Sequence, residues 1–181
     1  MQIKTWKKAV LLMFAILLSW GFFPAPGDSA DATKIYTDKF GYFSITPPQG
    51  WVRKDYPKET RARVRFTSPD DRATVGIIVR PVGPKEATFA KMLADKRLAL
   101  ENMRKKKPQG KYSLRESTIC GYKCIRVDTE YPGQRIQENY LFTGKGLHVN
   151  FCYGAVDRGS LEKYRKTAMD SFCTIKLTGK K

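Results

Sequence analysis

Four β-type stretches follow one another in the second half of the chain, and this run constrains the fold more than any other feature. Each stretch is bounded by glycine or proline, and the four cover Tyr112–Ile119, Tyr122–Tyr131, Arg135–Phe142 and Leu147–Tyr153. Turn residues this close together join neighbouring strands as hairpins. The run therefore predicts an antiparallel meander of four strands.

The first half of the chain adds further strands. The candidates are residues 42–46, 51–53, 61–66 and 73–82. In the third of these, Ala62, Val64 and Phe66 alternate with arginines, which predicts one core face and one outward face. Residues 73–82 form a more continuous apolar run, which favours a strand that is covered on both faces.

Two helices complete the predicted order of elements. Thr88 is a candidate N-cap for a helix that ends near Lys107, before Pro108. Apolar residues recur at helical spacing in a second segment, from Ser160 to Phe172. Strands, a helix, four strands and a helix predict an α+β fold, with helices packed on a central, twisted, mainly antiparallel sheet.

The first 32 residues have the organisation of a secretory signal peptide. Three lysines precede an apolar stretch of 15 residues, Ala9 to Phe23, and Ala30-Asp31-Ala32 is a candidate cleavage site. The apolar stretch is shorter than the ~20 residues that span a membrane, although an uncleaved anchor is the alternative. We expect residues 1–32 to be removed and residues 33–181 to fold as one domain in the periplasm or outside the cell.

The exported part carries most of a net charge of +17. Nucleic acid is the usual partner of such a charge, but export argues against it. We therefore expect an acidic protein or an anionic envelope surface as the partner, and a monomer as the oligomeric state. His148 is the single histidine, which argues against histidine-based metal sites, and no cofactor is expected.

Four cysteines in an exported chain indicate two disulfide bonds. They are Cys120, Cys124, Cys152 and Cys173, which allow three pairings. A three-residue hairpin loop would bring Cys120 opposite Cys124, and this would leave Cys152 to pair with Cys173. We take this pairing as the working prediction.

The opening of the first predicted strand resembles a known family. Residues 42–51 read YFSITPPQGW, which is similar to the F-S-I-x-x-P-x-G-W opening of the PsbP-like superfamily. That superfamily also includes exported bacterial proteins of the DcrB and LpqN type. The likeness continues through residues 75–82, Gly121 and residues 140–153 to Ser171-Phe172. The resemblance implies an α-β-α sandwich that acts as a binding or assembly module and not as an enzyme.

Two basic features are candidate partner-binding sites. Arg61, Arg63 and Arg65 fall on one face of one strand, where guanidinium groups suit carboxylate or phosphate. A charged edge strand is the alternative. The binding interpretation gains weight if Lys123, Arg126 or Arg135 lies on the same surface. The second feature, a solvated helix end or a peripheral membrane contact, is the run Arg104, Lys105, Lys106 and Lys107.

Two further hypotheses remain open. A small ligand could bind in a pocket between sheet and helix, with Trp51 and tyrosines as walls, although a Trp at such a turn is more often part of the core. A cysteine-dependent enzyme is a distant alternative, because Cys152 and His148 are two residues apart on one strand. Such catalysis needs a thiol with a lowered pKa.

Overall fold

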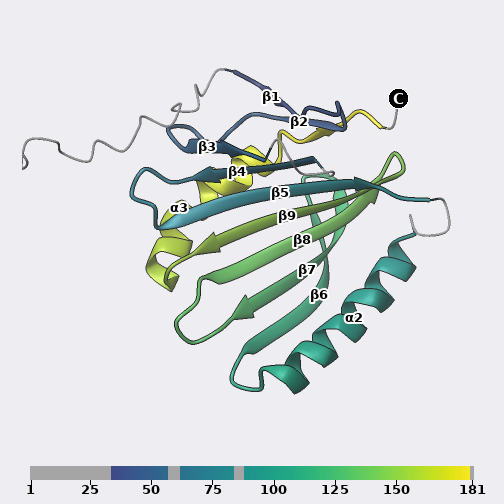
Figure 1. The fold of residues 1–181 in the computed structure, drawn as a ribbon, viewed down its shortest axis with the longest axis vertical. Helices are drawn as coiled ribbons and strands as arrows, with labels where there is room; N and C mark the ends of the chain where they lie inside the picture. The colour runs from purple at the N-terminus through teal and green to yellow at the C-terminus, as the bar shows by residue number, and fades with distance from the viewer. Residues whose placement is uncertain (1–33, 57–61, 84–87, 180–181) are drawn as a thin grey trace, which may run out of the picture.

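Residues 34–56, 62–83 and 88–179 are described by the structure, a computed structural model (Figure 1). Within them a seven-stranded antiparallel sheet has the order β3-β4-β5-β9-β8-β7-β6. Its strands are β3 (Val52–Asp55), β4 (Ala62–Thr67), β5 (Ala73–Pro81), β6 (Lys111–Ile119), β7 (Tyr122–Glu130), β8 (Ile136–Gly144) and β9 (Leu147–Ala155). The predicted meander is confirmed, since β6 to β9 are neighbours in chain order.

A smaller sheet joins the two ends of the described chain. It has the order β1-β2-β10, with β1 (Tyr36–Thr37), β2 (Phe43–Ile45) and β10 (Lys176–Leu177). The outer two strands have only two residues each, which is too short for a hydrophobic period. No local pattern therefore predicts β1 or β10.

The two helices lie on opposite faces of the large sheet, so the expected α-β-α sandwich is confirmed. Helix α2 (Phe89–Lys106) begins at Thr88, whose side chain accepts a hydrogen bond from the amide of Lys91. Helix α3 (Arg158–Phe172) begins two residues before the predicted start, because Asp157 caps it by accepting from the amide of Ser160. In Figure 1, α3 lies behind the sheet and α2 runs along β6 in front.

The face toward α3 holds the main core. Phe172 is fully buried, and its ring lies 4.6 Å from that of Phe151 and 5.8 Å from those of Tyr140 and Phe142, between centroids. Trp51 belongs to this core with an exposed fraction of 1%, edge-on to Tyr164. This placement agrees with the core alternative for Trp51, whose ring fills space between sheet and helix.

The opposite face is only partly covered. Helix α2 places Met92 and Leu100 against Ile125, Val127 and Leu141, which come from β7 and β8. No described element covers the same face of β4, β5 and β9. The expectation that residues 73–82 are covered on both faces is therefore wrong, because α2 packs at the β6 end of the sheet.

The disulfide bond differs from the predicted pairing. Cys120 is bonded to Cys173, with their Cα atoms 5.1 Å apart, whereas Cys124 and Cys152 are free thiols. The reason is the length of the β6–β7 turn, in which only Cys120 and Gly121 stand between the paired residues Ile119 and Tyr122. Cys124 is therefore opposite Ser117 and not opposite Cys120.

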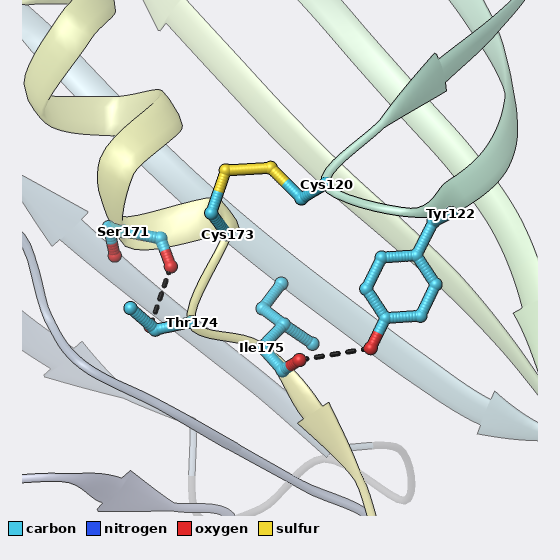
Figure 2. The surroundings of a disulfide bond; sticks show 6 residues. All are labelled: Cys120, Tyr122, Ser171, Cys173, Thr174 and Ile175. Atoms are coloured by element: carbon cyan, nitrogen blue, oxygen red, sulfur yellow. Dashed lines mark hydrogen bonds between the residues drawn. A yellow bond between two sulfur atoms is a disulfide. The ribbon is translucent and has the colours of Figure 1, made fainter.

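The bond that does form ties this hairpin to the end of α3. Figure 2 shows the neighbouring contact, in which the Tyr122 hydroxyl donates to the carbonyl oxygen of Ile175 at 3.0 Å. Cys120 has φ 52° and Gly121 has φ 80°, so both turn residues are in the left-handed region that a tight two-residue hairpin requires. The turn aims the Cys120 side chain at α3.

Candidate functional site

The uncovered part of the sheet forms a groove of about 470 Å³. Its lining comes from the α2-side face of β4, β5, β8 and β9, together with Asp71 and Arg135 from the adjoining turns. We call it the arginine groove, after Arg63, Arg65 and Arg135 in its lining. Across the strands, one row of paired residues is Arg65, Gly76, Cys152 and Asn139, and the next is Arg63, Ile78, Asn150 and Leu141.

At Gly76 the floor of the groove has no side chain. Its φ is not positive, and a Cβ atom added there would meet nothing nearer than the carbonyl oxygen of Cys152 at 4.0 Å. Neither backbone conformation nor space therefore requires glycine at this position. A glycine in a strand interior weakens the strand and often marks a place where a ligand approaches the backbone.

Arg65 is the exposed cation of the groove. Among the residues that the structure describes, no carboxylate forms an ion pair with it. Arg63 also lines the groove, with its guanidinium carbon 4.2 Å from the centre of the Tyr56 ring. Arg61, the third arginine of the predicted row, lies outside the described residues.

Arg135 joins the groove from the opposite side. It precedes β8, and its Nη2 donates to the backbone oxygen of Asp71 at 2.7 Å, in the β4–β5 turn. Its other terminal nitrogen, Nη1, is buried and has no hydrogen-bond partner among the described residues.

Three residues were named above as ones that would support a binding role for the arginine row if they lay on the same surface. Arg135 does lie on that surface. Arg126 lies on the α3 face with Glu138, and Lys123 contacts the Phe89 ring.

A second buried polar atom without a partner belongs to Asn150, which lines both the groove and the space next to α2. The side-chain oxygen of Asn150 is buried, and no group in the described part of the chain donates a hydrogen bond to it. Asn150 stands on β9 between Ile78 and Leu141, where an apolar side chain would suit the neighbours. Leaving a buried polar atom unpaired costs about 1–3 kcal/mol, so a native protein normally has a reason for one.

The other predicted basic cluster is elsewhere. Arg104, Lys105, Lys106 and Lys107 are exposed at the end of α2 and do not line the arginine groove. Arg104 donates to the backbone oxygen of Tyr112, and the Lys107 ammonium lies 4.8 Å from the centre of the Tyr131 ring. The structure thus separates the two basic features into a recessed site and a helix end.

Cys152 lies on the groove floor as a free thiol. Burial raises its pKa to about 11, although the charge of Arg65 acts in the opposite direction. The thiol is therefore protonated near neutral pH, and it lacks the lowered pKa that nucleophilic catalysis requires. His148 Nδ1 lies 3.1 Å from a terminal nitrogen of Arg80.

A smaller hollow of about 270 Å³ lies between α2 and the sheet and adjoins the groove. It shares Gln137, Asn139 and Asn150 with the groove, and Tyr131 is one of its walls. Lys96 also lines it, with a pKa that is lowered first by burial and then by the charge of Arg80. The ligand pocket expected between sheet and helix thus has a counterpart here, without Trp51.

The cleft on the opposite face has balanced charges. It measures about 300 Å³ and lies between α3 and β6–β8. At its centre the buried Glu138 accepts from Arg126 at 2.9 Å and from Arg165 at 2.6 Å, and it also accepts from the Tyr140 hydroxyl. Because the carboxylate is already fully paired, we interpret this cleft as a structural ion-pair network.

Within the described ranges, no group of three or more His, Cys, Asp or Glu side chains is placed to hold a metal ion. In the same residues no helix has both the length and the apolar character that crossing a membrane requires.

Comparisons with known proteins give the fold through solved structures. No protein-family model and no curated protein sequence matches the chain. Cyanobacterial PsbP (CyanoP) from Synechocystis sp. PCC 6803 superposes with a TM-score of 0.56 at 11% identity, over 80% of this chain and 91% of that one. A protein of Bacteroides thetaiotaomicron gives a TM-score of 0.52 at 13% identity, over 81% of this chain but only 48% of that longer one.

LpqN of Mycobacterium tuberculosis, described as involved in cell envelope biogenesis, gives a lower TM-score of 0.34 at 15% identity, with 78% of each chain covered. The argument for the fold therefore rests on the first two structures. The order of elements, the sandwich of two helices around an antiparallel sheet and these superpositions agree with the sequence resemblance. The chain has the PsbP-like fold.

Proposed function

We propose that this chain is an exported binding module without catalytic activity, which engages an acidic protein or an anionic envelope surface through the arginine groove. The observation that carries the proposal is Arg65, an exposed guanidinium without an ion pair in the described residues, beside Arg63 and above the open floor at Gly76. Guanidinium groups favour carboxylate and phosphate because they can donate two parallel hydrogen bonds.

Export is supported by two observations. The chain forms a disulfide bond, which persists in oxidising compartments, and it begins with a segment of signal-peptide character. That segment lies outside the described residues. The acidic partners available beyond the cytoplasm are protein faces, lipid headgroups and cell-wall polymers, all of which are attracted by the exported part, since it carries most of the net charge of +17.

The absence of catalysis is part of the proposal. The Cys152 thiol is protonated at neutral pH because burial raises its pKa to about 11. The buried acid Glu138 is held by two arginines and a tyrosine, so it is not available as a general base. Both observations favour binding over bond making at the sites that the structure describes.

The test compares two variants that lose the same charge. Arg65→Gln removes the groove cation, whereas Arg97→Gln removes an exposed cation of α2 that lines neither the groove nor the hollow. Binding of the purified protein is measured to polyglutamate, as an acidic protein surface, and to vesicles that contain phosphatidylglycerol. We expect Arg65→Gln to weaken binding in at least one arm and Arg97→Gln to leave it near wild type.

Salt provides the second measurement. Because the interaction is between charges, raising the salt to ~0.5 M shortens the screening length to about 4 Å and should weaken binding strongly. Equal loss in both variants would show a general effect of net charge and would contradict the proposal. Binding that does not change with salt would contradict it as well.

A further inference from the structure

We propose that the arginine groove recognises an oxyanion that carries hydroxyl groups beside it, as a phosphate or carboxylate does on a polyol or sugar. This inference rests on the function proposed above and narrows the chemistry of the partner. It follows from what the groove offers besides positive charge: an unpaired acceptor, a row of polar side chains and an open floor.

The unpaired acceptor is the side-chain oxygen of Asn150. It is buried and lacks a donor among the described residues. A small turn of the Asn150 amide toward the groove would expose it, and an occupant that then pairs it must bring an O–H or N–H group. A carboxylate of an acidic protein side chain, or a phosphodiester alone, offers only acceptors. The occupant therefore needs a donor group in addition to its charge.

Arg65 supplies the charge that pairs with the oxyanion, because no carboxylate in the described residues forms an ion pair with it. Arg135 precedes β8, where its Nη2 donates to the backbone oxygen of Asp71 and lies 3.5 Å from the carboxylate of the same residue. Its Nη1 is buried and has no surface to offer a ligand, so the charge of Arg135 is already used within the protein.

The spacing suits one small ligand. Arg65 is on β4 and Asn150 is on β9, with β5 between them, so their strands are two spacings or roughly 10 Å apart. The long side chain of Arg65 covers part of the distance between these two strands. Polar side chains stand along the rest of the floor, among them Thr74, Gln137 and Asn139, and they can hydrogen-bond to further hydroxyl groups.

The recessed shape of the groove favours a small projecting group over a flat surface as its occupant. The groove has a volume of about 470 Å³, which falls in the usual range of small-molecule sites. At Gly76 the floor carries no side chain, and a Cβ atom added there would meet no heavy atom nearer than the carbonyl oxygen of Cys152, at 4.0 Å. An extended bilayer surface would meet the rim of such a recess, whereas a sugar or polyol phosphate can enter it.

The experiment is isothermal titration of the purified protein with matched small probes. The phosphate arm uses glycerol phosphate, inorganic phosphate and glycerol, and the carboxylate arm uses glucuronate and acetate. We expect glycerol phosphate or glucuronate to bind at least about tenfold more tightly than its simple anion, because it gains hydrogen bonds to Asn150 and the floor. The series of probes that binds, phosphate or carboxylate, identifies the chemical class of the anion.

Three variants separate the contributions. Arg65→Gln should lower affinity for the hydroxylated probe by about ten- to a hundredfold, the usual effect of losing a charge-assisted hydrogen bond. Asn150→Leu should bring the hydroxylated probe down to the affinity of its simple anion while leaving the simple anion unchanged. Gly76→Val keeps every charge but fills the floor of the groove with a side chain, so it should reduce the binding of all anions. Arg97→Gln is the control, because Arg97 does not line the groove.

The outcomes separate this inference from the proposed function. If simple anions bind as tightly as hydroxylated ones, or if Asn150→Leu changes nothing, the inference is wrong and the proposed function is unaffected. If no small probe binds while polyglutamate binding still depends on Arg65, the inference is again wrong and the proposed function stands. If neither small probes nor polyanions depend on Arg65, both fail.

Discussion

The two faces of the central sheet are formed by the same strands but differ in their side chains: one face is a buried core and the other is an open groove. On the face toward α3, Phe151, Tyr153 and their neighbours are fully buried, and Phe172 closes the core. At the alternate positions of β9, Asn150, Cys152 and Gly154 line the open groove. Because successive side chains of a strand point to opposite faces, one sequence stretch can stabilise the fold on one face and leave the other available for binding.

The difference teaches where stability and binding should be found. Apolar burial on the α3 face, together with the smaller cluster under α2, provides the folding free energy, so substitutions in the α3 core should unfold the protein. The groove face buries small, polar and charged groups, some of them unpaired, so substitutions there should alter binding and leave stability unchanged or improved. The predictions below test this separation.

The largest effect is expected in the α3 core. Phe172→Ala removes a fully buried ring that contacts Tyr140, Phe142 and Phe151. It should lower the free energy of unfolding by about 3–5 kcal/mol, as measured by urea denaturation. Arg65→Gln on the groove face should change the same quantity by less than about 0.5 kcal/mol. Similar losses for both would erase the difference between the faces.

The disulfide should have the next largest effect on stability. It closes a loop with a sequence separation of 53 residues, and losing it should cost about 2–4 kcal/mol. The melting temperature is measured with and without reductant in the wild type and in the double variant Cys120→Ser, Cys173→Ser. The double variant should not respond to reductant. A response that persists there, or one that disappears in Cys152→Ser, would mean that a different pair is bonded.

The thiol of Cys152 gives a pH-dependent test of the groove floor. Burial raises its pKa to about 11, so the reactive thiolate is a small fraction of the total at pH 8. Its rate of alkylation should rise about tenfold for each pH unit between 8 and 10, since the thiolate fraction does. The rate is followed by mass spectrometry in a Cys124→Ser background. A rate that is fast and flat from pH 7 upward would show an activated thiol and would reopen the enzymatic alternative.

The smallest effect is expected from the unpaired amide. Asn150→Leu removes a buried oxygen without a hydrogen-bond partner in the described residues and places an apolar side chain between Ile78 and Leu141. Stability should stay level or rise by up to about 1 kcal/mol, as measured by urea denaturation. A loss of more than about 1 kcal/mol would indicate that Asn150 serves the fold, and the contrast between the faces would then be weaker.

Local patterns were sufficient to predict most of the fold. The alternation of Val64 and Phe66 with arginines placed the core face of β4 correctly, and the Thr88 cap and Pro108 placed the ends of α2. The strands β6 to β9 followed from their turn residues. These features depend on neighbours in sequence, which is why periodicity and turn chemistry could indicate them.

The candidate site depended on contacts that are distant in sequence. Arg135 reaches the arginine row only because β9 pairs with β5, which is an order of strands that no local pattern contains. The predicted disulfide pairing is wrong because it requires a three-residue loop, whereas the β6–β7 turn has two residues. One signal was available: small and polar residues alternate along three strands, at Thr74 and Gly76, at Gln137 and Asn139, and at Asn150 and Cys152.

The most direct test of the account is to locate bound anion on the labelled protein by NMR. Glycerol phosphate is titrated into protein enriched in ¹⁵N, and the shifts of the backbone amides are followed. The account predicts that the largest shifts fall on the groove rows of β4, β5 and β9, centred on Arg65, Gly76 and Cys152. Shifts concentrated at residues 104–107, or spread over the basic surface without a centre, would contradict it.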